Sequence, residues 1–337
     1  MLSTATMAEY FDLNTLTLLV ARALQVDVGA VRLIAIPIGK HNRSYYIESP
    51  AGAHVLRIAP PDDAGFLFYE VHMMRQEPAL HTLIRKHLPI PVADVVHYDF
   101  TRTHFERDYL IMTALPGIPL SAATNLTPAR LNRALRQTGE CLRQLHSLTA
   151  EKCLGQGFYG YVGAHKPMTP QPTWWDAFRL MWHKLIDDVV TCQAYSPEEG
   201  QAMRDLLDYY RRYFDRPVVS RLLHMDVWSQ NILVDDAGNV TGLVDFDRAL
   251  WGDPEIEFAV LDYCGISEPA FWEGYGTMRD TSAAAAVRRQ FYLLYEVQKY
   301  MPIEIWRRNN PASAQRYKQQ CLALAAELLP SRSRSIN

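Results

Sequence analysis

The stretch 224–247 constrains the fold of this chain more than any other part of it. A polar segment comes first, followed by an apolar run at 232–234, a polar turn at 235–239 that contains a glycine, and a second apolar run at 240–244. Two short apolar runs around such a turn predict a β-hairpin. The hairpin must bring the residues before its first strand next to those that follow its second.

Three polar side chains are brought together by this hairpin, namely Asp226, Asn231 and Asp245. Phosphoryl transfer needs such a set: one carboxylate to orient a hydroxyl and accept its proton, and an amide oxygen with a second carboxylate to hold Mg²⁺. The spacing Asp-x-x-x-x-Asn, with a later Asp before Phe, is that of kinase catalytic segments. The alternative is a plain hairpin with aspartates in its turns and a buried His224. The combination with the surrounding pattern favours a kinase.

The part of the chain before residue 116 is rich in predicted strands. Apolar runs separated by turn residues predict an antiparallel meander, and a helical pattern interrupts it before two further strands. The predicted strands are 33–38, 45–47, 55–58, 95–98 and 109–113, and the helical pattern spans 66–87 with an interruption at Pro78.

The part after residue 117 is mainly helical. Thr127-Pro128 predicts a helix start, because threonine caps helices and proline fits their first turn. Asp253-Pro254 starts another predicted helix, which Gly265 ends. Further helices are predicted at 174–195, at 197–214 and from 266 to 329. We therefore predict an α+β fold of two lobes, 1–116 and 117–337, with the hinge at Pro116-Gly117.

Length and charge agree with a two-lobed globular protein and argue against a nucleic-acid binder. A chain of 337 residues is longer than a single hydrophobic core usually accommodates, and a formal net charge of −3 lacks the basic excess of nucleic-acid-binding proteins. The five cysteines are scattered and form no metal-binding motif, so we expect free thiols in a reducing cytoplasm. We also expect no signal peptide and no membrane span, because the most apolar early stretch, 16–24, is short and contains Arg22.

The sequence resembles the aminoglycoside phosphotransferase and choline kinase superfamily, whose members share the two-lobed fold of protein kinases. The resemblance covers most of the chain and is strongest in two segments, 224–231 and 243–254. It implies that Asp226 is the catalytic aspartate, that Asn231 and Asp245 bind Mg²⁺, and that ATP is the phosphoryl donor. The chain departs from the family in Met225, where glycine is usual, and in Glu257, where aspartate is frequent.

The resemblance also assigns nucleotide contacts in the first lobe. Gly39, Asn42 and Ser44 belong to a segment similar to the family's phosphate-covering loop, for which a simple hairpin turn is the alternative. Arg57 occupies the place of the strand lysine that grips the phosphates. Its partner is predicted to be Glu77, with Glu70 as the other candidate. The adenine-facing strand and hinge include Thr113 and Leu115.

The acceptor is predicted to be a small hydroxylated molecule that carries a positive charge. Tryptophans and carboxylates suit a cation, and the candidates are Trp175, Trp228, Glu257 and Asp262. Core tryptophans and helix-capping acids are the structural alternative. Trp228 and Ser229 are also similar to the fructosamine kinase version of the loop, so fructosamine- and choline-type kinases stay open beside an aminoglycoside-like acceptor.

The sequence disfavours two other functions, those of a protein kinase and of a non-catalytic nucleotide-binding protein. A protein kinase is disfavoured, because the chain has neither a GxGxxG loop nor an APE-type segment. A non-catalytic nucleotide-binding protein of the same fold is disfavoured by the intact set Asp226, Asn231 and Asp245. We expect a monomer or a homodimer, with no nucleic-acid partner.

Overall fold

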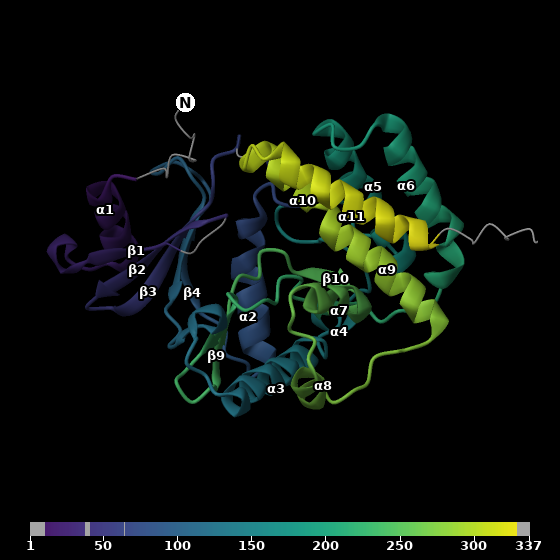
Figure 1. The fold of residues 1–337 in the computed structure, drawn as a ribbon. Coiled ribbons are helices and arrows are strands. Elements are labelled where there is room, and N and C mark those ends of the chain that lie inside the picture. The colour runs from purple at the N-terminus through teal and green to yellow at the C-terminus, as the bar shows by residue number, and fades with distance from the viewer. Residues whose placement is uncertain (1–10, 38–40, 64, 329–337) are drawn as a thin grey trace, which may run out of the picture.

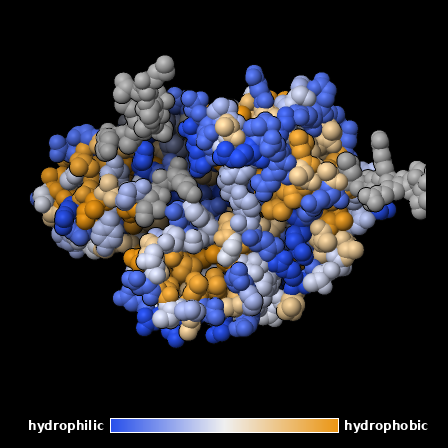
Figure 2. All heavy atoms as spheres, viewed as in Figure 1, coloured by the Kyte–Doolittle hydropathy of each residue, from blue (hydrophilic) through white to orange (hydrophobic). Residues whose placement is uncertain are grey.

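The protein has a small lobe built on one sheet and a larger, mostly helical lobe (Figure 1). The computed structural model describes residues 11–37, 41–63 and 65–328. The architecture is α+β, as the sequence predicts. Figure 2 shows hydrophilic side chains over much of the visible face, with hydrophobic ones gathered on the small lobe at the left, below the centre, and on the large lobe at the right.

The sheet of the small lobe has five strands in the order β1-β2-β3-β5-β4, and every neighbouring pair is antiparallel. Leu56 and Ile58 are fully buried in the core under helix α1, and Arg57 lies between them. Side chains alternate between the two faces of a strand, so Arg57 points away from α1. The elements are α1 (Leu13–Leu24), β1 (Arg32–Ile36), β2 (Arg43–Ser49), β3 (Gly52–Ile58), β4 (Val95–Asp99) and β5 (Tyr109–Thr113).

Helix α2 (Glu77–His87) is shorter than the helical pattern of the sequence predicts. Residues 68–72 form turns, and Met73–Gln76 is a 3₁₀ turn. Pro78 lies in the first turn of α2, where its missing N–H and fixed φ are tolerated. The proline therefore starts the helix rather than interrupting it, and Glu77 becomes its first residue.

The large lobe contains the predicted hairpin together with most of the helices. The hairpin is formed by β8 and β9, and β6 pairs with β8 in the same small sheet. A separate pair, β7 with β10, lies beside it. The elements are β6 (Ile118–Pro119), α3 (Pro128–Leu145), α4 (Ala150–Leu154), α5 (Trp174–Thr191), α6 (Pro197–Tyr209), β7 (Arg221–Leu223), β8 (Ile232–Val234), β9 (Val240–Leu243), β10 (Leu250–Gly252), α7 (Pro254–Tyr263), α8 (Pro269–Tyr275), α9 (Ala283–Gln298), α10 (Tyr300–Pro302) and α11 (Pro311–Leu328).

Capping residues explain where several of these helices begin and end. The Thr127 hydroxyl accepts the N–H of Arg130, which confirms the predicted start of α3. At the start of α7 the Asp253 side chain accepts the N–H of Glu255, and just after the end of that helix Gly265 has φ +69°. The predicted helical run from 266 onward is wrong as a continuous element, because α8 ends at Gly276 in a left-handed conformation and α9 begins only after the cap Ser282.

Gly117 lies at the predicted hinge between the two lobes, in a conformation that suits glycine. Its φ is +97°, and a Cβ atom there would lie 2.6 Å from the carbonyl oxygen of Val234. Glycine is therefore required where this segment lies against β8. In the described part of the chain, no helix combines the length and the apolar character needed to cross a membrane.

Candidate active site

The loop between β7 and β8 carries the predicted catalytic residue and is fixed by a buried histidine. His224 accepts the N–H of Asp226 at Nδ1, at 3.2 Å, and donates from Nε2 to the Val244 carbonyl, at 3.1 Å. One neutral tautomer satisfies both bonds. The ring also lies 4.3 Å from that of Phe246. His224 thus links the loop to the end of the hairpin.

Both carboxylate oxygens of Asp226 have partners. Asn231 donates from Nδ2 to Oδ2 at 2.9 Å and to the Asp226 carbonyl at 2.9 Å. Arg248 donates to Oδ1 at 2.8 Å. The Asp226 side chain remains one quarter exposed, so an acceptor can reach it. Because the Asn231 nitrogen makes both bonds, its amide oxygen is left to bind a cation.

Asp245 follows β9 and faces the small lobe. Its φ is +71°, a conformation that L residues rarely adopt outside functional sites. Its Oδ1 accepts a hydrogen bond from Arg57 at 2.6 Å, and the other guanidinium nitrogen of Arg57 donates to Glu77 at 2.6 and 2.8 Å. Arg57 therefore joins the two lobes.

Electrostatics in this cluster favour the charged forms of the arginine and of Asp245. Burial raises the pKa of the Asp245 carboxyl, but the Arg57 guanidinium, the hydrogen bond with Asp247 and the charge of His224 together outweigh burial and lower that pKa. Burial likewise opposes the charge of Arg57, and the carboxylates of Asp245, Glu77 and Asp247 overcome it and raise the arginine pKa.

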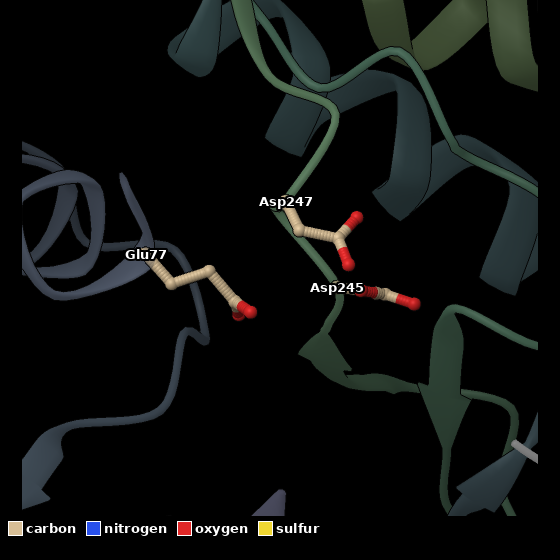
Figure 3. A group of neighbouring side chains, drawn as sticks. All are labelled: Glu77, Asp245 and Asp247. Atoms are coloured by element: carbon tan, nitrogen blue, oxygen red, sulfur yellow. The ribbon is translucent and has the colours of Figure 1, made fainter. Parts of the chain in front are cut away.

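Asp247 brings a third carboxylate to the same place. Figure 3 shows Glu77 reaching in from the side of α2, and Asp245 and Asp247 from the segment after β9. One carboxylate oxygen from each lies within 4.8 Å of the others. Burial, and then the charge of Asp245, raise the pKa of Asp247 well above its usual value. Three acids face one guanidinium, so a divalent cation would offset the excess negative charge, and oxygen ligands are those that Mg²⁺ prefers.

The comparison with known families decides what kind of site this is. Residues 32–291 match the sequence profile of the phosphotransferase enzyme family. The chain belongs to this family. This membership confirms the prediction that the protein is an ATP-dependent kinase of small molecules, similar to aminoglycoside phosphotransferases.

Individual relatives of this phosphotransferase agree with that assignment. The chain is 25% identical to a "probable ketoamine kinase" of Vibrio parahaemolyticus, over 77% of this chain and 82% of the relative. It is 24% identical to hygromycin-B 4-O-kinase of Escherichia coli, over 67% and 60% of the two chains. Its fold is similar to that of aminoglycoside phosphotransferase APH(4)-Ia in a complex with AMP-PNP and hygromycin B, with a TM-score of 0.62, 21% identity and coverage of 93% and 99%. This likeness confirms the two-lobed, kinase-like fold.

The predicted nucleotide residues of this phosphotransferase lie on or next to β2 and β5, the two strands that flank Arg57 on β3. Ser44 stands opposite Arg57 in the β2–β3 pair, and the buried Asn42 donates to Asp247 at 3.3 Å. Thr113 is the last residue of β5, and Leu115 packs against the hydrophobic cluster that contains Met112 of that strand. Gly39 lies outside the described residues.

The second candidate partner of Arg57 has another contact. Glu70 forms an ion pair with Arg307, whereas Glu77 holds Arg57. Glu77 is therefore the partner of Arg57, and Glu70 instead binds the C-terminal part of the large lobe through Arg307.

Two predicted substrate residues are wrong, because their side chains turn inward. Glu257 is fully buried: it accepts the N–H groups of His224 and Met225 and contacts His146 at 2.6 Å. Trp175 is 6% exposed and packs against Phe214 in the core. Glu257 thus holds the backbone before Asp226, whereas Trp175 belongs to the hydrophobic core of the large lobe.

The other two substrate residues lie nearer the surface. Asp262 is paired with Arg279, whose guanidinium makes two hydrogen bonds to it, so its charge is already balanced. Trp228 is half-buried and follows Asp226 closely in the catalytic loop. Its role as an acceptor contact stays a prediction.

Sequence reasoning missed three residues that the structure brings to the site. Asp247 and Arg248 follow the predicted Asp245 directly and were visible as charged neighbours. Gln76, just before α2, donates from Nε2 to the Asp247 carbonyl at 2.5 Å and so links the small lobe to this segment. No local pattern signals that contact, because 171 positions separate the two residues.

Proposed function

We propose that the protein transfers the γ-phosphoryl group of Mg·ATP to a hydroxyl of a small, hydroxylated molecule. The observation that carries the proposal is that two hydrogen-bonded pairs, Asp226 with Asn231 and Asp245 with Arg57, lie at the same end of the hairpin. His224 links them, because it bonds both to the Asp226 N–H and to the carbonyl of Val244, the residue before Asp245. Phosphoryl transfer depends mainly on positioning and charge stabilisation, which this set supplies.

Asp226 is proposed to orient the acceptor hydroxyl and accept its proton. Its carboxylate is partly exposed, while its hydrogen bonds to Asn231 and Arg248 fix its direction. Each carboxylate oxygen keeps a second lone pair for a hydroxyl. The fixed carboxylate therefore holds the proton-accepting atom at one place.

Mg²⁺ is proposed to be held by Asp245 and the amide oxygen of Asn231, with Asp247 nearby. When bound, this ion neutralises charge on the β- and γ-phosphate oxygens. Arg57 is proposed to contact the α- and β-phosphates, since a guanidinium is a strong donor to phosphate. It stays held by Glu77 while it does so.

The acceptor is proposed to be a sugar-like molecule, with aminoglycosides as the first candidates. Glu257 and Trp175 are buried and Arg248 contacts Asp226, so the amino groups of such an acceptor are proposed to bind away from Asp226, and a hydroxyl to bind next to it. A ketoamine is the second candidate, favoured by Trp228-Ser229 in the catalytic loop and by the ketoamine kinase relative.

A screen of acceptors tests this function. Purified protein with Mg·ATP would be offered hygromycin B and other aminoglycosides, glycated amines, neutral sugars, choline-type amino alcohols and a generic protein. ADP release is expected with one small-molecule class and is expected to vanish in Asp226→Asn, which controls for contaminating kinases. Phosphorylation of the protein substrate alone would contradict the proposal.

The cellular place of the reaction is also part of the proposal. All five cysteines are free, and three of them are buried. Unpaired thiols are typical of a reducing compartment, and ATP is available there. We propose that the enzyme acts in the cytoplasm.

A further inference from the structure

Arg248 is the one charged side chain seen to contact Asp226 in the described part of the chain. Its guanidinium is 7% exposed and donates from Nη1 to Asp226 Oδ1 at 2.8 Å. The second terminal nitrogen, Nη2, donates to Glu296 Oε2 at 3.2 Å. One planar group therefore connects the catalytic loop to helix α9.

The far end of this connection is itself anchored. Glu296 is 1% exposed, and its other carboxylate oxygen forms an ion pair with Lys299, which is 6% exposed. The charges alternate from Asp226 through Arg248 and Glu296 to Lys299, so each buried charge has an opposite neighbour. The arrangement leaves Arg248 little freedom to move.

An aromatic face from the small lobe covers the guanidinium. The centre of the Arg248 guanidinium lies 5.5 Å from the ring centroid of Tyr69, within the range of a cation–π contact. Tyr69 in turn stacks on Tyr161, with ring centroids 5.1 Å apart. The guanidinium is thus held by α9, by the catalytic loop and by a segment that precedes α2.

We propose that Arg248 is a positioning residue for phosphoryl transfer, which fixes the orientation of the Asp226 carboxylate. This inference rests on the proposed role of Asp226. Asn231 holds Oδ2 and Arg248 holds Oδ1, so the carboxylate cannot rotate about its terminal bond. A displacement of about 1 Å in a reacting group can cost about 100-fold in rate. The contact with Arg248 restricts the carboxylate to the orientation in which it meets the acceptor hydroxyl.

Replacement of Arg248 by alanine and by lysine tests the inference. Arg248→Ala is expected to lower kcat for the acceptor identified in the screen, with hygromycin B as the first probe, by about 100-fold, while KM for ATP stays within a few-fold. Arg248→Lys is expected to restore little of the rate, because one ammonium group cannot span two carboxylates as the planar fork does. A purely structural role would instead lower ATP affinity together with kcat, whereas a loss of thermal stability is expected in either case because Arg248 is a buried charge.

A double-mutant cycle separates action through Asp226 from independent effects. In the Asp226→Asn background, Arg248→Ala is expected to change kcat by less than about threefold, because the group that it positions is already lost. Equal fold-changes in both backgrounds, or wild-type kcat in Arg248→Ala, would overturn the inference. Wild-type turnover in Asp226→Asn alone would instead overturn the proposed function.

Two further variants complete the design. Arg179→Lys changes an exposed arginine of the same lobe, paired with Asp208, and is expected to keep wild-type kcat. Glu296→Gln removes the anchor of Arg248 without touching Asp226, and is expected to lower kcat about 10-fold with unchanged affinity for Mg·ATP. If Arg248→Ala does not fold, Glu296→Gln carries the test, and wild-type kcat in that variant contradicts the inference.

Discussion

Two residues of the site adopt a backbone conformation that their side chains disfavour. Met225 has φ +66° and Asp245 has φ +71°. Each such residue costs on the order of 1–3 kcal/mol, which the surroundings must offset. The Met225 N–H donates to Glu257 at 2.6 Å, and its side chain is fully buried. The family resemblance places glycine at this position, which fits the left-handed conformation.

The catalytic carboxylate gives the first prediction. Asp226→Asn is expected to lower kcat by about 100-fold or more and to leave the affinity for Mg·ATP nearly unchanged, because the carboxylate acts on the acceptor hydroxyl. Steady-state kinetics and calorimetry would measure the two effects. Equal losses of kcat and of nucleotide affinity would place Asp226 in the nucleotide site instead.

The cation ligands give the second prediction. Asp245→Ala is expected to abolish Mg²⁺-dependent binding of ATP, and Asn231→Ala to weaken it less, since it removes a neutral ligand. Titrations of ATP with and without Mg²⁺ would measure the difference. An exposed acid, Asp236→Ala in the hairpin turn, serves as the control. Unchanged Mg·ATP affinity in Asp245→Ala would contradict the assignment.

At the scale of elements, the sequence predicts structure formed by neighbouring residues but not contacts between residues far apart in the chain. The hairpin could be predicted, because its strands are adjacent in the chain and its turn has a glycine. The contact of Arg248 with Glu296 could not, because 48 positions separate them. The orientation of α7 could not be predicted from the sequence either. Its first turn carries two acids, Glu255 and Glu257, and only the packing of the helix shows that Glu257 turns inward.

Helix α7 supports the catalytic loop through one buried carboxylate, and this gives the third prediction. Burial raises the pKa of Glu257, but the contact with His146, the charge of His224 and the hydrogen bond from the Met225 N–H together outweigh burial, and the pKa is lowered. A lowered folded-state pKa contributes stability above the unfolded value of about 4.5, and this contribution is lost as the pH falls. Glu257→Gln is therefore expected to reduce the free energy of unfolding at pH 7 by about 1–3 kcal/mol.

Urea unfolding at several pH values would check this prediction. The difference between wild type and Glu257→Gln is expected to shrink as the pH falls below about 4.5, where the carboxylate of the wild type becomes protonated. Glu106→Gln changes a glutamate whose side chain is 76% exposed and should be neutral at every pH. A difference that does not depend on pH would show that the charge of Glu257 is unimportant.

At the scale of the whole molecule, the two lobes are joined at more places than the hinge. The segment 65–70 belongs to the small lobe by sequence but packs on the large one. Arg307 donates to the Gly65 carbonyl at 3.0 Å, and the Phe68 N–H donates to Asp188 on α5 at 2.8 Å. Together with the contact of Gln76 to Asp247, these bonds hold Glu77 in place beside Arg57.

Asp188 makes this junction sensitive to pH, which gives the last prediction. Burial raises the pKa of Asp188 to about 7, and the charges of Glu70 and Asp187 add to this effect. The hydrogen bond from the Phe68 N–H and the nearby cation Lys184 oppose it only in part. A raised folded-state pKa contributes stability below the unfolded value of about 4, and this is lost as the pH rises towards 7.

Asp188→Asn keeps an oxygen that can accept the Phe68 N–H but carries no charge, so it should raise the free energy of unfolding at pH 8 by roughly 1–2 kcal/mol after allowance for solvent screening. The difference from wild type, measured by urea unfolding, is expected to vanish near pH 4, where both side chains are neutral. Asp205→Asn, an exposed aspartate on α6, is the matched control and should show no such trend. A lower stability of Asp188→Asn at pH 8 would show that the carboxylate stabilises the junction as an anion, contrary to this argument.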